Sequence, residues 1–272
     1  MSSFTEVIRA RLENNKNALI AIIGETGSGK SYTALRLAEL IDDDFNVAEK
    51  VCFRPVEFVK AVQKARKHSV IVFDEAGVGI PAREWWSIQN RLLDYVIQTF
   101  RFKNLCVIFT MPNLNFIDEH ARLLFHYVLE TQFIDYEAET VVLKPFKVTT
   151  YSRTRKTYFV YPRVKNVVLT RLVVSKPSER VVREYEVKKE RYLNELYNEI
   201  TETLESKVEK ETRSIDEEII AYFEENPHIL KRFKKKTDLA VFLRQKFKIG
   251  IRRAESLAGY LLRGGCVCRE ES

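Results

Sequence analysis

Long apolar runs are missing from this sequence, and so is any cysteine spacing typical of a metal site. No run approaches the roughly 20 residues of a membrane-spanning helix, and residues 1–4 lead straight into charged residues. Cys52 and Cys106 sit in apolar, strand-like runs, whereas Cys266 and Cys268 lie in a glycine-led tail. We expect a soluble, intracellular, cytoplasmic protein with two buried thiols and an exposed pair; a terminal disulfide or metal site at that pair is the alternative.

Acidic residues are outnumbered in this chain. There are 45 Lys and Arg against 38 Asp and Glu, which gives a formal net charge of +7 and a pI near 9.1. Such an excess favours an acidic partner, and nucleic acid is the commonest one. With 272 residues, 45% of them hydrophobic, the chain can bury a sizeable core and form one large domain and a small one.

Only nine glycines are present, and three of them fall within residues 24–31, which read Gly-Glu-Thr-Gly-Ser-Gly-Lys-Ser. This stretch follows the apolar run 18–23, which is long enough for one buried strand. It precedes residues 32–41, whose apolar positions recur at helical spacing. Strand, glycine loop and helix in this order predict a phosphate-binding loop. Glycines let successive N–H groups turn around a phosphate, and the helix adds its positive dipole end.

We expect this loop to bind the phosphates of ATP together with Mg²⁺. Lys30 would reach the β- and γ-phosphates, where it also takes part in catalysis, and the Ser31 hydroxyl would ligate Mg²⁺. The expected nucleotide-binding residues are Gly24, Glu25, Thr26, Gly27, Ser28, Gly29, Lys30, Ser31 and Tyr32. A glycine-rich turn that matches the pattern by chance is the alternative.

Two carboxylates follow the apolar run 70–73. Such a run, ending in Asp74 and Glu75, predicts a strand buried on both faces whose acids emerge at its carboxyl end, where ligands bind in open α/β sheets. Asp74 would hold Mg²⁺ through its water shell, and Glu75 would be the base that polarises the attacking water. A surface pair that caps the next element is the alternative.

Polar residues also end the predicted strand 105–110. Thr110 and Asn113 would lie beside the acids, where a polar side chain can contact the γ-phosphate or the attacking water. We include Asn113 among the catalytic candidates. A plain cap between strand and loop is the alternative for both residues.

Helical and strand-like patterns alternate through the first half of the chain, which predicts an α/β fold. The predicted helices cover 3–15, 55–64, 82–101 and 118–125, and the further strands cover 47–53 and 126–131.

The motifs at 24–31, 74–75 and 110–113 together resemble the additional-strand P-loop ATPases with a catalytic glutamate. Within these, residues 74–77, followed by 83–86, 98–101 and 116–118, are similar to archaeal and mobile-element ATPases of the HerA/FtsK-like group. That group includes DNA pumps, conjugation and packaging motors and Zot-like proteins, generally working as hexameric rings. The group often has a glutamine after the fourth strand, where this chain reads Thr-Met-Pro-Asn.

The resemblance covers about residues 1–135. It implies a three-layer P-loop NTPase core, ATP and Mg²⁺ as cofactors, and self-assembly into a hexamer or another ring. A ring ATPase usually needs an arginine from the neighbouring subunit to stabilise charge on the γ-phosphate. Arg83 and Arg101 are the better candidates and Arg122 is the third. The alternative for each is an ordinary surface or ion-paired arginine.

Residues 139–175 are rich in β-branched and aromatic residues, which predicts strands. Residues 152–156 are the polar turn of a predicted hairpin, and seven Lys or Arg but no acid lie between Lys144 and Lys165. Cations interleaved with aromatic rings are typical of strands that contact nucleic acid. The candidate DNA contacts in the hairpin are Arg153, Arg155 and Lys156. An edge hairpin protected by charge, or packed on a neighbouring subunit, is the alternative.

Residues 178–210 predict a long, charged helix that serves as stalk and linker. Beyond it, helices are predicted over 215–224, 237–247 (capped by Thr237) and 251–262, with a glycine turn at 248–250. The last two helices predict a helix-turn-helix or winged-helix-like module. Its candidate DNA contacts are Lys234, Lys235, Lys236, Arg252 and Arg253. A small protein-interaction domain is the alternative.

We therefore divide the chain into a P-loop ATPase domain at 1–175 with a basic hairpin at 139–175, a helical linker at 176–211, and a helical DNA-binding-like module at 212–272. The function expected is that of an oligomeric, DNA-associated ATPase motor. One alternative is an ATP-gated DNA-binding or regulatory protein with slow hydrolysis. The other is an ATPase adaptor whose last helices bind protein, and a partner at a membrane also remains open.

Overall fold

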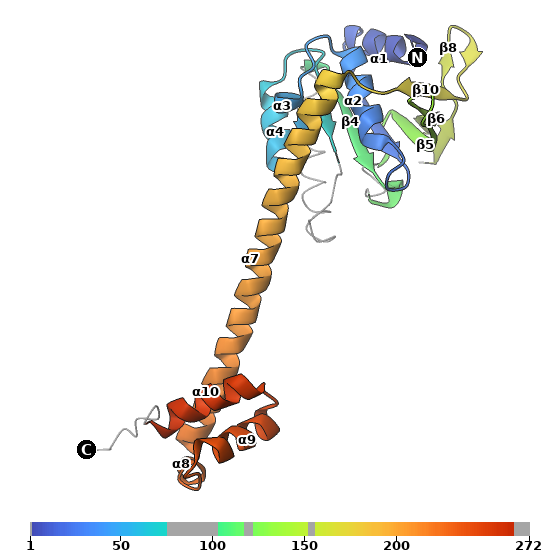
Figure 1. The fold of residues 1–272 in the computed structure, drawn as a ribbon. Helices are drawn as coiled ribbons and strands as arrows, with labels where there is room; N and C mark the ends of the chain where they lie inside the picture. Colours follow the sequence, from blue (N-terminus) through green and yellow to red (C-terminus); the bar gives the residue numbers. More distant parts are fainter. Residues whose placement is uncertain (1, 75–102, 117–121, 152–155, 264–272) are drawn as a thin grey trace. The chain divides into compact units, whose positions relative to one another are not determined.

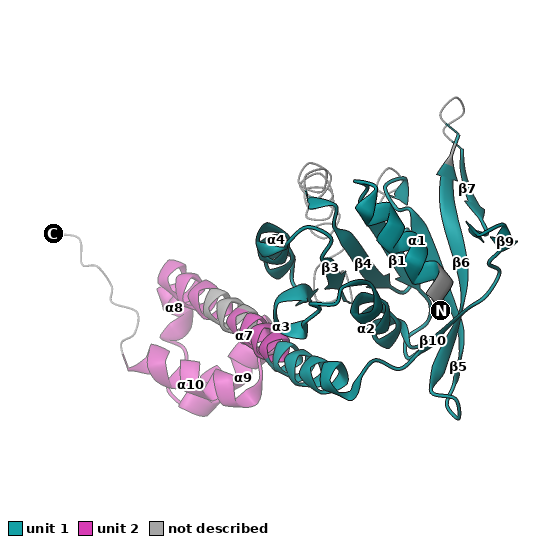
Figure 2. Cartoon of the chain, turned by 90° about the horizontal axis from the view of Figure 1, so that it is seen from above, with its two compact units in different colours: residues 1–194 teal, residues 195–272 magenta. Residues whose placement is uncertain are grey.

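A computed structural model describes the chain except for residues 1, 75–102, 117–121, 152–155 and 264–272 (Figure 1). The chain divides into two compact units, residues 1–194 and residues 195–272, which are coloured separately in Figure 2. Each unit is described by itself. Among the residues that the structure describes, no helix is long and apolar enough to cross a membrane.

The first unit is built on an eight-stranded sheet in the order β10-β6-β5-β1-β4-β3-β2, with β7 added beside β6. Five strands run parallel: β2 (Val51–Cys52), β3 (Val70–Phe73), β4 (Cys106–Met111), β1 (Ala18–Ile23) and β5 (Tyr127–Asp135). The strand expected at 105–110 therefore lies between the strand before the glycine loop and the strand before Asp74. Sequence periodicity had no means of predicting this order.

Helices cover both faces of the parallel strands. On one face Leu19, Ala21 and Val128 form a buried cluster with Phe58 and Val62 of α4 (Pro55–Lys64). Successive strand residues point to opposite faces. Accordingly, Tyr127 packs edge-on against Phe4 of α1 (Ser2–Glu13), and α2 (Lys30–Ile41) packs against β3 and β4. The result is the three-layer α/β arrangement expected from the sequence.

An antiparallel extension enlarges the sheet beyond β5. β6 (Thr140–Thr150) pairs with β5, with β7 (Thr157–Val160) and with β10 (Leu172–Ser175). The expected hairpin is thus confirmed as β6–β7, although 140–150 is one strand rather than two. A separate two-stranded pair joins β8 (Arg163–Val164) to β9 (Val167–Val168).

The prediction of a strand over residues 47–53 is mostly wrong. Residues Val47–Lys50 form the short helix α3, and only β2 is extended. Asn46 accepts a hydrogen bond from the backbone N–H of Glu49, so it caps α3. This bond satisfies a backbone donor at the start of the helix, and it therefore favours a helical turn at Val47–Lys50 over an extended strand.

Residues Glu179–Glu225 form one continuous helix, α7, where separate helices over 178–210 and 215–224 were expected. It ends before Asn226-Pro227, as predicted, because proline cannot continue a helix. Its first turns belong to the first unit, where Tyr185 and Tyr192 are buried. The expected solvent-exposed stalk therefore begins later along the helix than its charge pattern indicates.

The second unit is helical. The end of α7, α8 (Pro227–Leu230), α9 (Lys236–Phe247) and α10 (Ile251–Leu262) share a core that includes Phe223, Leu243 and Leu257. The predicted turn is confirmed, with Lys248 in the left-handed conformation at φ 53°. Thr237 is not the cap of α9, since the N-cap position is Lys235 and the Thr237 hydroxyl contacts Asp238.

Candidate nucleotide-binding site

The glycine loop joins β1 to the start of α2, as the sequence predicts. Gly24, Gly27 and Gly29 have φ values of 151°, 78° and 82°, a region that other residues rarely adopt. The Gly24 N–H donates to the carbonyl of Pro112 after β4, and this bond ties the loop to the neighbouring strand. The backbone of residues 24–29 therefore turns at each of the three glycines.

Two of these glycines lie against the sheet too closely for a side chain. A Cβ at Gly29 would come within 2.6 Å of Cγ2 of Val141 on β6, and one at Gly24 would collide with the Thr131 hydroxyl on β5. Thr131 also bonds the Ser28 hydroxyl, with oxygens 2.8 Å apart, and donates to the Ile23 carbonyl. In this glycine cradle, Gly24 and Gly29 pack on β5 and β6 where only glycine fits, and this packing holds the loop backbone in the turned conformation that a phosphate-binding loop needs.

Lys30 and Ser31 lie in the first turn of α2, where backbone N–H groups lack helical acceptors. The Lys30 ammonium donates to the carbonyls of Gly24 and Glu25 at 2.9 and 2.6 Å. Its charge therefore lies across the loop, within reach of a phosphate held there. A lysine and a hydroxyl at a helix N-terminus fit a Mg²⁺-bound phosphate chain.

Asp74, at the end of β3, is 1% exposed and bonded through both oxygens. The Thr110 hydroxyl donates to Oδ1 and the Tyr185 hydroxyl donates to Oδ2, each at 2.6 Å. The expectation that Thr110 lies beside the acid is confirmed. Tyr185 was missed, because its sequence context indicates only one face of a long charged helix.

The sheet sets the spacing between the carboxylate and the loop. Thr110 is level with Ile22 of β1, and the residues before Thr110 and Asp74 are paired across β4 and β3. Asp74 therefore lies two strand spacings, roughly 10 Å, from the strand that enters the loop. A hydrated metal ion that contacts both the carboxylate and a loop-bound phosphate would have to bridge that separation.

A mostly apolar pocket of about 250 Å³ adjoins the loop. Its lining residues are Gly29, Tyr32, Thr33, Ile134, Tyr136, Glu139, Thr140, Val141, Ser175 and Lys176. A flat aromatic base fits between apolar side chains and tyrosine rings of this kind. The residues from β5, β6 and β10 were not predicted, because they come from strands distant in sequence that carry no motif.

Tyr32 connects the loop helix to α7. Its hydroxyl donates to Oε1 of Glu186 at 2.8 Å, and its ring contacts Tyr185 edge-on. Burial, and then the hydrogen bond to Glu186, raise the pKa of Tyr32 to about 12. Tyr32 is therefore protonated at neutral pH and remains a donor to Glu186.

The remaining catalytic candidates are placed only in part. The Asn113 side chain accepts from the N–H of Asn115 at 2.9 Å, so it caps the turn after β4, which is the alternative noted from the sequence. Arg122 is half-buried at the edge of the described chain. Glu75, Arg83 and Arg101 lie outside the described residues, and their roles stay predictions.

The candidate DNA contacts show two environments. Lys156, Lys234, Lys235, Lys236 and Arg252 are exposed, whereas Arg153 and Arg155 lie outside the described residues. Arg253 instead bonds Asp216 of α7, with Nε and Nη2 at 3.0 and 2.9 Å from Oδ1. Its guanidinium is thus engaged within the second unit.

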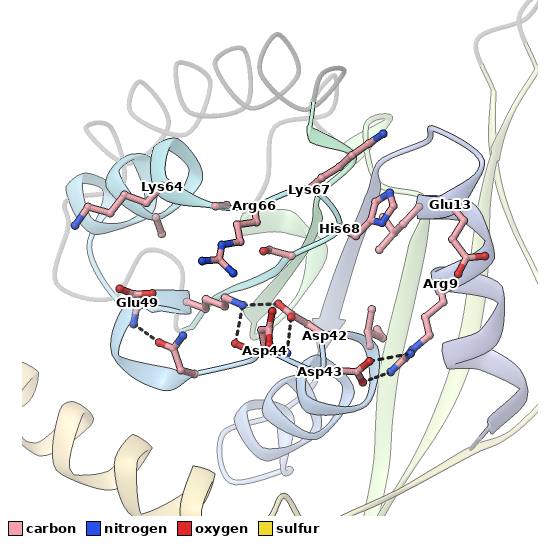
Figure 3. A pocket seen from close by; sticks show the side chains of 17 residues that line it. Arg9, Glu13, Asp42, Asp43, Asp44, Glu49, Lys64, Arg66, Lys67 and His68 are labelled. Carbon is pink, nitrogen blue, oxygen red and sulfur yellow. Dashed lines mark hydrogen bonds and ion pairs between the residues drawn. The ribbon is translucent and has the colours of Figure 1, made fainter.

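A charged pocket of about 510 Å³ lies at the other end of the parallel strands, away from the loop (Figure 3). Asp42 accepts from Lys50 at 2.8 Å and from the backbone of Val70, and Arg9 pairs with Asp43 at 2.6 Å. Arg9, Asp42 and Asp43 are thus engaged within the fold. We take the glycine loop as the candidate site because it combines turned glycines and a lysine at a helix N-terminus with a buried carboxylate at a nearby strand tip.

The described residues contain no group of three or more His, Cys, Asp or Glu side chains that would bind a metal ion. Mg²⁺ in nucleotide sites usually takes one or two protein ligands and completes its shell with water and phosphate oxygens. Ser31 and Asp74 fit that pattern, since one supplies a hydroxyl and the other a buried carboxylate.

No protein-family model and no curated protein matches this chain. Among solved structures, the chain is similar to the N-terminal domain of zonular occludens toxin from Neisseria meningitidis. The identity is 13%, the TM-score is 0.30, and the match covers 55% of this chain and 96% of that one. We draw neither fold nor function from a likeness of this size.

Proposed function

We propose that the chain is a Mg²⁺-dependent ATPase that acts on DNA as an oligomer. The observation that carries the proposal is the glycine cradle at Gly24 and Gly29, two strands away from the buried carboxylate of Asp74. A strand between these two motifs is also the feature for which the additional-strand ATPases are named. A glycine turn without a ligand does not explain a buried acid at a strand tip two strand spacings away.

Each residue has a defined part in this proposal. The loop N–H groups and Lys30 bind the phosphates, while Ser31 and Asp74 hold Mg²⁺, which neutralises phosphate charge. Glu75 takes a proton from the attacking water, and an arginine of a neighbouring subunit, Arg83 or Arg101, stabilises the γ-phosphate. The base lies in the pocket beside Tyr32 and Tyr136, whose rings can flank it.

The DNA assignment is supported by where cations and rings lie. The β6–β7 hairpin exposes Lys147 and Lys156 together with Tyr158 and Phe159, which are 49% and 46% exposed. Large apolar side chains at the surface beside cations favour a partner with phosphates and stackable bases. The exposed lysines 234–236 at the start of α9 add a second set of phosphate contacts.

The test is steady-state ATP hydrolysis by the full chain, with and without double-stranded DNA, alongside its oligomeric state. We expect Mg²⁺-dependent turnover that DNA stimulates and that Glu75→Gln removes while nucleotide binding survives. Slow hydrolysis unaffected by DNA, with nucleotide-dependent DNA affinity, would instead support a regulatory DNA-binding protein. Hydrolysis by a strict monomer without affinity for DNA would contradict the motor.

A further inference from the structure

The first turns of α7 contact the carboxylate that is expected to hold Mg²⁺. The Tyr185 hydroxyl donates to Oδ2 of Asp74 at 2.6 Å, and Nζ of Lys189, one turn further along the helix, lies 3.9 Å from the same oxygen. Tyr185 is 2% exposed, and the Lys189 side chain is 23% exposed. A phenol and an ammonium on α7 therefore face one oxygen of the proposed metal ligand.

This placement depends on how α7 packs against its own unit. The Lys188 ammonium donates to the carbonyls of Val47, Ala48 and Val51, and Tyr192 stacks on Phe53 with ring centroids 4.8 Å apart. Glu186 accepts from Tyr32, the residue after Ser31 in the loop helix. The segment that carries Tyr185 and Lys189 is thus anchored on α3, on β2 and on the loop helix.

Mg²⁺ and these two side chains make opposing demands on Asp74. A hydrated Mg²⁺ presents water donors that compete with the Tyr185 hydroxyl for the lone pairs of Oδ2. The ion also brings two positive charges close to the Lys189 ammonium, and like charges repel strongly where water is scarce. Thr110 donates to the other oxygen, Oδ1, and belongs to the same sheet, so it does not compete for Oδ2.

We propose that Tyr185 and Lys189 oppose Mg²⁺ at Asp74, so that binding of Mg²⁺-nucleotide and packing of residues 182–192 against the rest of the first unit are thermodynamically linked. This inference rests on the proposed function. The linkage is reciprocal, so weakening the α7 contact strengthens Mg²⁺ binding, and Mg²⁺-nucleotide loosens the contact to the same degree. The metal site thereby biases the helix through which the chain continues into its second unit.

The first test measures how Mg²⁺ supports binding of a fluorescent ATP analogue to the full chain. The variants are Tyr185→Phe, which removes one hydroxyl, and Lys189→Gln, which removes one charge; Tyr197→Phe is the control, because Tyr197 is 62% exposed on the same helix. We expect Tyr185→Phe to lower the half-saturating Mg²⁺ concentration about three- to tenfold, the range of one net hydrogen bond. Lys189→Gln should act in the same direction, and its effect should shrink in high salt.

Unchanged or raised half-saturation in both variants, with the wild type binding normally, overturns the inference and leaves the proposed function standing. A wild type that binds no nucleotide at any Mg²⁺ concentration overturns both. Circular dichroism of each variant establishes that it is folded. Lys189→Gln carries the test if the buried Tyr185→Phe does not fold.

The second test is hydrogen exchange of the α7 amides. In the wild type, Mg²⁺ with nucleotide should speed exchange across residues 182–192, whereas nucleotide with a chelator should not. In Tyr185→Phe the faster exchange should already be present without ligand. Exchange that slows or does not change on addition of Mg²⁺-nucleotide contradicts the linkage, because a merely structural tyrosine would be indifferent to the metal.

Discussion

Gly27 and Gly29 share a left-handed backbone but differ in their surroundings. At Gly27 a Cβ would have open space, whereas at Gly29 it would press on Val141. Both Gly→Ala changes carry the backbone strain of φ near 80°, but only Gly29→Ala adds a collision with a buried side chain. We expect Gly29→Ala to lower the free energy of unfolding in urea by about 1–3 kcal/mol more than Gly27→Ala does.

The same pair tests the cradle. Gly29→Ala should also weaken binding of an ATP analogue more than Gly27→Ala, since it shifts the loop away from β6. Equal stability and equal affinity in the two variants would mean that contact with β6 does not shape the loop.

The fold disfavours the protonated form of His126. Its Nδ1 accepts from the N–H of Leu19 at 3.0 Å, and burial, with a smaller effect from Arg11, lowers its pKa to about 4. Between about pH 6.5 and pH 4 the unfolded chain binds a proton that the folded chain does not, so stability falls as the pH falls. The loss across this window should be about 3 kcal/mol at most.

Urea unfolding at pH 7 and pH 4.5 measures this loss. His126→Gln should reduce the pH dependence, while His228→Gln, a change at an exposed histidine, should leave it as in the wild type. Equal pH dependence in all three proteins would show that His126 does not cause the loss of stability at low pH.

At the scale of elements, the sequence predicts what local pattern determines. The glycine loop, β1, β4 and α10 were predicted because glycine positions, apolar runs and helical spacing are local properties. The helix α3 was missed because Val47, Val51 and Phe53 read as one apolar strand. Asn46 followed three residues later by Glu49 is a local signal for the start of a helix, and the prediction did not use it.

The position of α7 was beyond local pattern. Helical periodicity identifies Tyr185 and Tyr192 as members of one face but does not say what covers that face. Their partners, Asp74 and Phe53, lie more than 100 residues away. For the same reason, the sequence did not predict that Thr131 and Val141 lie against the glycine loop.

Arg252 and Arg253 are neighbours on α10 with different expected roles. Arg253→Ala removes the partly buried pair with Asp216 and should destabilise the second unit by about 1 kcal/mol. Arg252→Ala, at an exposed site, should leave stability within about 0.5 kcal/mol but weaken DNA binding. Hydrogen exchange of the α9 and α10 amides in the full chain, with DNA titrations at two salt concentrations, separates the two effects.

Asp216→Asn is the matched control for that pair. It should speed hydrogen exchange of the α9 and α10 amides as much as Arg253→Ala does, while Arg252 remains in place. If Arg252→Ala leaves DNA affinity and its salt dependence unchanged, α10 is not a DNA-contacting helix, and an adaptor that binds protein becomes the better account.

For the whole molecule, fold and site were predictable to different depths. The α/β class follows from alternating helical and strand-like patterns, and the loop follows from its motif. The sheet order that brings Asp74 beside the loop through Thr110 depends on long-range pairing, and so does the base pocket, which draws on β5, β6 and β10. Pairing of distant strands is decided by packing that no local pattern encodes.

The central claim is that the glycine loop at residues 24–31 binds Mg²⁺-nucleotide. Calorimetric titration of ATP with Mg²⁺ into the full chain tests it most directly, with Lys30→Met compared under the same conditions and shown to be folded by circular dichroism. The account predicts one site per chain in the wild type, a large loss of affinity in Lys30→Met, and weaker binding when Mg²⁺ is chelated. Absence of binding, or equal affinity in the wild type and Lys30→Met, would contradict it.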